Sequence, residues 1–90
     1  MSMNTQEFLT RAGLDVQTLE VWVEQQWLIP AETSAGASFF DRDVARARLV
    51  QNLRGDLGIN DEGIGVILHL LDQLHGLRSA MAMLHEGVGE

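Results

Sequence analysis

The apolar positions between Leu14 and Pro30 recur at the spacing of a helix, and the residues just before them are typical of a helix start. Asp15 can accept hydrogen bonds from the free N–H groups of the next helical turn. Gly13 can adopt the left-handed conformation that ends a preceding helix. The side chains predicted to face inward follow the 3.6-residue period: Val16, Leu19, Val23 and Trp27. Two short helices joined by a tight turn that contains glycine are typical of a helix-turn-helix.

The first of these two helices is predicted at about residues 5–12, because Asn4 and Glu7 have the spacing of a capping box. After the second helix, a small polar segment at residues 33–36 separates two short apolar runs. These runs are predicted to pair as a small two-stranded wing: Leu28–Ile29 and Ser38–Phe40.

A third helix is predicted to follow the wing at about residues 42–54, with Asp41 as its cap. Gly55 and Gly58 are expected to break it. Its inward face is predicted to carry four apolar residues at helical spacing: Val44, Ala47, Val50 and Leu53.

The longest predicted helix starts after Asn60 and runs from about Asp61 to Met83 or a little beyond. Its apolar residues form two stripes. The first stripe is Ile64, Ile67, Leu71 and Leu74. The second stripe is Val66, Leu70, Leu77, Met81 and Leu84. A helix that packs only on its own domain needs one apolar stripe, so the second stripe is predicted to form a homodimer interface or a partner groove. The alternative is that the domain itself wraps both stripes.

Together these elements predict a mostly all-α fold, a helix-turn-helix with a small β wing and a long C-terminal helix, in a single domain over residues 1–90. The helix-turn-helix and wing occupy residues 5–40, the third helix residues 41–58 and the long helix residues 60–86. A chain of this length buries only about 60–65% of its unfolded surface. A second copy or a partner would therefore stabilise it.

The net charge of −7 favours a basic protein partner over nucleic acid or an anionic membrane. The chain has no cysteine, which excludes disulfides and thiol catalysis. Its first ten residues lack the basic and apolar regions of a secretory signal. No stretch has the length and apolar character of a membrane helix, so we expect a cytoplasmic protein.

The outer face of the second helix is acidic where a DNA-binding helix would be basic. No lysine or arginine occurs between Arg11 and Arg42. Because phosphate contacts supply most of the affinity for DNA, we expect this face to bind a protein instead. The residues predicted to contact that partner are Gln17, Glu20, Val21 and Glu24, together with Asp41 and Asp43.

Candidate chemistry is sparse. His69, Asp72 and His75 are spaced three residues apart on the long helix, but they fan across a wide arc and lack an evident fourth ligand. We interpret them as a solvated polar stripe, and we predict no metal, no cofactor and no enzymatic activity. Trp22 lies at the edge between the two faces of the second helix. It is either a core residue or a partial anchor for a partner.

The order and residues of three segments, 7–30, 38–60 and 62–78, resemble the MerR-type winged-helix family and, within it, the CbpM-like chaperone modulators. In DNA-binding members, the recognition helix has a Leu-Arg-Tyr-Tyr run and the wing a Gly-Tyr-Arg-aliphatic-Tyr run. The segments at those places here are Leu19–Trp22 and Gly36–Phe40, with Glu20 and Ser38 replacing the arginines. Both departures remove phosphate contacts.

The resemblance implies that the protein binds the J-domain of a CbpA/DnaJ-type co-chaperone and blocks its stimulation of DnaK. J-domains carry a basic helix that engages DnaK, so an acidic face could compete for it. The alternative is a DNA-binding transcriptional regulator of the MerR type. A sensor of a metal or small ligand is a third hypothesis.

Overall fold

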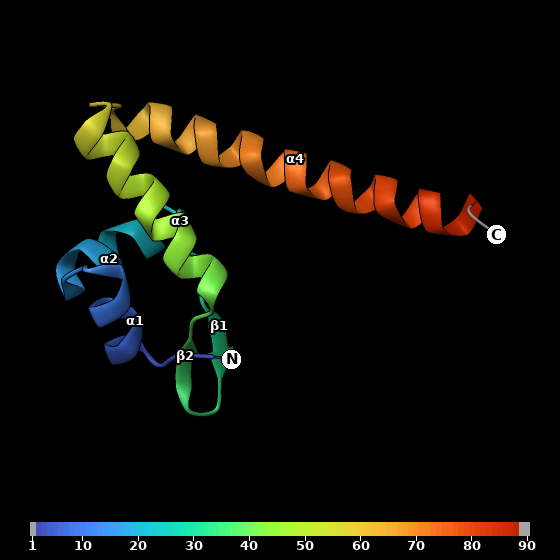
Figure 1. The fold of residues 1–90 in the computed structure, drawn as a ribbon. Coiled ribbons are helices and arrows are strands. Elements are labelled where there is room, and N and C mark those ends of the chain that lie inside the picture. The colour runs from blue at the N-terminus through green and yellow to red at the C-terminus, as the bar shows by residue number, and fades with distance from the viewer. Residues whose placement is uncertain (1, 89–90) are drawn as a thin grey trace.

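The computed structural model describes residues 2–88, with side chains for residues 2–85. Helices α1 and α2 come first, strands β1 and β2 follow, and α3, the π-helix η1 and the long α4 complete the chain (Figure 1). Their bounds are α1 Thr5–Ala12, α2 Val16–Glu24, β1 Ala31–Thr33, β2 Gly36–Ser38, α3 Asp41–Gln51, η1 Asn52–Asp56 and α4 Asp61–Val88. The predicted fold class is confirmed.

Local capping signals determine the helix-turn-helix. The Asn4 side chain accepts from the Glu7 N–H at 2.9 Å, and the Glu7 carboxylate accepts from the Asn4 N–H at 3.2 Å. Gly13 ends α1 in the left-handed conformation, with φ 70°. Asp15 then accepts from the Thr18 N–H at 2.7 Å and starts α2. The capping box, the glycine turn and the Asp15 cap are therefore confirmed.

The end of α2 contains a turn that the sequence pattern does not predict. The N–H of Trp27 donates to the Trp22 carbonyl and the N–H of Gln26 donates to the Val23 carbonyl, at 2.9 and 3.0 Å. This pair of bonds is a Schellman motif, which ends a helix with a left-handed residue. That residue is Gln26, with φ 64°. The turn ends α2 at Glu24 and directs Trp27 into the core from outside the helix.

This early end corrects the predicted inner face of α2. Leu19 is buried as predicted, but Val16 is 50% exposed and Val23 is 36% exposed. Trp22 is the second buried residue of the helix, at 3% exposure. Trp27 lies beyond the end of α2 and is not part of its apolar stripe, so the buried side of α2 is centred on Leu19 and Trp22. Trp22 is thus a core residue, and its indole N–H is buried with no acceptor among the described residues.

The wing exists, but its strands lie closer to the turn than predicted. Ala31 pairs with Ser38 and Thr33 with Gly36 in an antiparallel ladder. Leu28 belongs to the core, at 1% exposure, and Pro30 has no N–H to donate to a ladder. Phe39 forms an isolated bridge with Met3 instead of extending β2.

The start of α3 differs from the prediction in one residue role. Phe40 is the N-cap, and the buried Asp43 carboxylate accepts from the Phe40 N–H at 2.8 Å. Asp41 is exposed and is the first helical residue, so it does not cap α3. At its other end, α3 passes at Gln51 into η1, which contains Gly55, so Gly55 does not end the helical segment as predicted. Gly58 follows η1 and adopts the left-handed conformation, with φ 64°.

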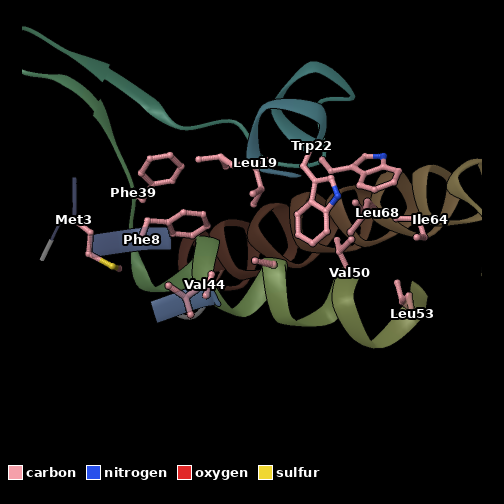
Figure 2. Close-up of a cluster of buried hydrophobic side chains, with 14 residues drawn as sticks. Met3, Phe8, Leu19, Trp22, Phe39, Val44, Val50, Leu53, Ile64 and Leu68 are labelled. Carbon is pink, nitrogen blue, oxygen red and sulfur yellow. The ribbon is translucent and has the colours of Figure 1, made fainter. Parts of the chain in front are cut away.

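The core draws on α1, α2, α3, the first turns of α4 and the segments beside the wing (Figure 2). Phe8 and Phe39 stack with ring centroids 4.2 Å apart, and Trp22 and Trp27 pack at 6.0 Å in a tilted arrangement. The predicted inward face of the third helix is confirmed, since Val44, Ala47 and Val50 of α3 and Leu53 of η1 are all buried.

Helix α4 packs on the core only near its start and then projects away from the rest of the molecule (Figure 1). Ile64 and Leu68 are buried, at 0% and 3% exposure. Asp72 accepts two hydrogen bonds from Arg46 of α3, at 2.7 and 3.1 Å. Leu74, predicted to lie on the inward stripe, is 40% exposed.

Candidate protein-interaction surfaces

The first candidate surface is the exposed side of α2. It consists of Val16, Gln17, Glu20, Val21, Val23 and Glu24, and we call it the α2 outer face. All six side chains are exposed, and Val21 is 47% exposed. Four of them were candidate partner contacts from the sequence. The two valines at positions 16 and 23 were missed because the 3.6-residue period placed them with the core.

The carboxylates of this face have no counter-ion of their own. Among the described residues, neither Glu20 nor Glu24 lies within 4 Å of an arginine side chain. The two glutamates are four residues apart, where like charges repel each other on a helix. Glu24 is also the last residue of α2, at the negative end of the helix dipole. Both carboxylates therefore lie on a helix that carries no basic residue.

The two aspartates predicted to extend this surface differ from each other. Asp41 is exposed, with its carboxylate 3.5 Å from Arg11. Asp43 is only 7% exposed, and its carboxylate is already used at the start of α3. Asp43 is therefore corrected from a candidate contact to a structural residue.

The second candidate surface is the second apolar stripe of α4. Its five residues are 56–69% exposed: Val66, Leu70, Leu77, Met81 and Leu84. The alternative that the domain wraps both stripes is wrong for this chain alone, because the body contacts only the first turns of α4. Leu74 and Met83 are further exposed apolar side chains of the same helix, at 40% and 73% exposure.

With both surfaces described, comparison with known proteins gives one positive finding. Residues 3–86 match the sequence model of the MerR helix-turn-helix family of regulatory proteins. The chain belongs to this family. It is a family of regulators and not of enzymes. No curated protein and no solved structure matches the chain.

In this MerR-family domain, α1, Gly13 and α2 form the helix-turn-helix, and β1 and β2 form the wing. Neither α2 nor the wing contains a lysine or an arginine. Glu32 is an exposed acid on β1. The elements that would approach DNA therefore contribute negative charge only. Within the described residues, no helix is both long and apolar enough to span a membrane.

Two residues of the predicted polar stripe of α4 contact other side chains. Asp72 is engaged by Arg46, whose hydrogen bonds lower the pKa of the Asp72 carboxyl. The His69 ring lies 3.1 Å from the Gln73 side chain. Among the residues described, no group of three or more His, Cys, Asp or Glu side chains is placed to hold a metal ion.

An open hollow of about 540 Å³ lies between α3 and α4. Its apolar wall includes Leu49 and Leu71, and its polar lining includes Arg46 and Asp72, which bind each other, together with Arg42, Asp43 and His75. Arg46 also donates to the Trp27 carbonyl. Arg46 and Asp72 thus join α4 to α3 and to the segment around Trp27.

Proposed function

We propose that this MerR-family protein is a chaperone modulator. In this proposal it binds the J-domain of a CbpA/DnaJ-type co-chaperone through the α2 outer face, and so blocks the co-chaperone's stimulation of DnaK. The observation that carries the proposal is the α2 outer face itself, which exposes valines and unpaired glutamates and lacks any cation. The resemblance to CbpM-like modulators supplies the identity of the partner.

The electrostatic argument joins the face to its partner. A J-domain uses a basic helix to engage DnaK, and Glu20 and Glu24 would give that helix a complementary surface. Bringing a cation close would relieve the repulsion between the two glutamates and the unfavourable dipole at Glu24. Charge complementarity mainly increases the association rate and the specificity. Occupation of the basic helix would then exclude DnaK by competition.

Binding to DNA is the alternative that the same surface argues against. Specific DNA binders gain much of their affinity from lysine and arginine contacts to phosphates. Placing α2 in a groove would bring Glu20 and Glu24 towards phosphates without a compensating cation on α2 or the wing. A gel-shift assay with duplex DNA across a salt series should therefore show no retardation at physiological salt. A retarded band that weakens steeply with salt would favour the transcriptional regulator instead.

Calorimetric titration of the full chain with the cognate J-domain tests the proposal. We expect a dissociation constant of about 1 μM or tighter, equivalent to about 8 kcal/mol. Glu20→Arg with Glu24→Arg should weaken binding at least about tenfold, or about 1.4 kcal/mol. The matched control is Asp56→Arg with Glu62→Arg, which makes the same change in net charge at exposed positions outside α2.

Three results would contradict the proposal. The first is no binding of the wild-type chain. The second is equal affinity of the α2 charge-reversal variant, and the third is an equal loss in the control variant. The last would show that net charge, rather than this face, attracts the partner. A DnaK ATPase assay with the co-chaperone supplies the functional measurement, in which the chain should reduce stimulation in proportion to binding.

We also propose that the protein forms a homodimer through the exposed stripe of α4. Five exposed apolar residues of that helix follow one another at alternating spacings of four and three: Leu70, Leu74, Leu77, Met81 and Leu84. This 3.5-residue repeat is the pattern of helices that pair along a continuous seam. The stripe and the α2 outer face lie on different elements, so dimerisation and partner binding use separate residues.

A further inference from the structure

Two apolar side chains on the α2 outer face lie outside the buried core. Val16 and Val23 are 50% and 36% exposed, although their spacing is that of a buried helix stripe. They lie seven residues apart, or roughly 10 Å along the helix axis. A single exposed valine needs no explanation, but this pair lies on the same side of one short helix.

Helical geometry places a carboxylate between the two valines. Residues three and four apart are neighbours on a helix surface. Val16, Glu20 and Val23 therefore form one row, in the order apolar, acidic, apolar. Gln17, Val21 and Glu24 form the adjacent row, at the same spacing. The face is a mixed surface in which each carboxylate has a valine beside it.

We infer that Val16 and Val23 are the apolar anchors of the α2 outer face, and that its partner is a basic amphipathic helix. Such a helix presents apolar side chains about two turns apart, with lysine or arginine between them. The inference rests on the function proposed above, because it concerns the same surface. It adds which residues hold the partner and what the partner must offer besides charge.

Because the face carries both valines and carboxylates, it fits a basic amphipathic helix better than a segment that is only positively charged. A uniformly basic segment would satisfy Glu20 and Glu24 but would leave both valines facing water or charged groups. An amphipathic helix removes apolar surface from water on both sides, and association gains most from such central, desolvated contacts. The acidic residues and the valines should therefore contribute to different steps of binding.

That division gives a kinetic test. Surface charges mainly determine the association rate, whereas desolvated contacts mainly determine the dissociation rate. In a surface-plasmon-resonance measurement with the J-domain, Val16→Ala with Val23→Ala should raise the dissociation rate at least about fivefold and leave the association rate within about twofold. Glu20→Gln with Glu24→Gln should instead lower the association rate. The difference in association rate between this variant and the wild type should shrink as the salt concentration rises.

Alanine is the appropriate replacement because it has a higher helix propensity than valine, so α2 should remain folded. The matched control is Leu57→Ala, which truncates a side chain 68% exposed outside α2 and should change neither rate. An oligoarginine peptide is the second probe. Because it offers charge without apolar side chains, its weak binding should be the same for the wild type and the valine variant.

The outcomes separate the inference from the function on which it rests. If the wild type binds the J-domain and the valine variant dissociates at the wild-type rate, the anchor assignment is overturned and the proposed function stands. If the Leu57→Ala variant dissociates as fast as the variant with Val16→Ala and Val23→Ala, the assignment of the anchors to α2 is also overturned. If the wild type does not bind at all, both proposals fail.

Discussion

Single residues at the ends of the helices determine where the helix-turn-helix begins and ends. Asn4, Gly13 and Asp15 each act through hydrogen bonds or backbone freedom within a few positions of the chain. Their roles are therefore visible in the sequence. Gln26 is the exception, because a left-handed glutamine is uncommon and the sequence gives no signal for it. This one residue places Trp27 in the core and leaves Val23 outside it.

Replacing Gln26 with glycine should stabilise the fold. A side chain in the left-handed region costs about 1–2 kcal/mol, and glycine avoids this cost but gains entropy in the unfolded chain. We expect a net gain of about 1 kcal/mol in the free energy of unfolding, measured by urea denaturation. Gln25→Gly is the control, because Gln25 has an ordinary helical conformation and should lose stability instead. A loss for Gln26→Gly would contradict the turn described here.

Replacing Glu24 with glutamine should separate stability from function. The change removes an acid from the negative end of the helix dipole and from a like-charged neighbour four residues away. We expect about 0.5 kcal/mol of added stability, or a rise in Tm of about 2–4 °C by calorimetry. The same variant should bind the J-domain more weakly. A Glu24→Gln variant that is less stable than the wild type and binds the J-domain with wild-type affinity would count against a functional role for this charge.

At the scale of whole elements, the long helix combines two parts with different surroundings. Its first turns pack on the core through Ile64 and Leu68, and Asp72 ties the next part to Arg46 of α3. Beyond that ion pair, its described side chains are all exposed. The length of α4 follows from its sequence, whereas the point at which it leaves the body depends on how far α3 and the segment around Trp27 extend.

Two glycines of α4 should respond oppositely to alanine. A Cβ at Gly63 would lie 2.7 Å from Cγ2 of Ile59 and 3.2 Å from the capping oxygen of Asn60. A Cβ at Gly76 would meet nothing within 4 Å. We expect Gly76→Ala to add about 1 kcal/mol of helix stability and Gly63→Ala to lose about 1 kcal/mol through overpacking. Circular dichroism during urea denaturation measures both, and equal gains would contradict the crowded start of α4.

At the scale of the whole molecule, the chain is not compact. Its radius of gyration is 15.3 Å, whereas a compact chain of this length has about 12 Å. The difference arises from α4, which extends away from the helix-turn-helix and wing (Figure 1). An extended helix with an exposed apolar stripe is costly to leave in water, so the arrangement favours a second copy along α4.

Leu77→Asp tests the proposed dimer. A carboxylate in an apolar seam is unfavourable unless it is paired, so the dimer should dissociate at least about a hundredfold more readily. Ser79→Asp is the matched control, because residue 79 lies on the opposite side of α4 from the stripe. Sedimentation equilibrium of the full chain should then give a monomer for Leu77→Asp and a dimer for the wild type and Ser79→Asp. A monomeric wild type, or a dimeric Leu77→Asp variant, would exclude this interface.

The amino-acid sequence by itself determined the helices, the caps that start α1 and α2, the existence of the wing and the acidic character of α2. These features depend on hydrogen bonds between residues a few positions apart or on the charges present in one segment. The tertiary structure decided which side of α2 is buried, the register of the wing and the burial of Asp43. Those outcomes depend on where the chain turns after α2 and on which distant residues, such as Phe39 and Met3, meet it. Helical periodicity marks the apolar positions, but only the packed chain decides which of them are buried and which are left exposed.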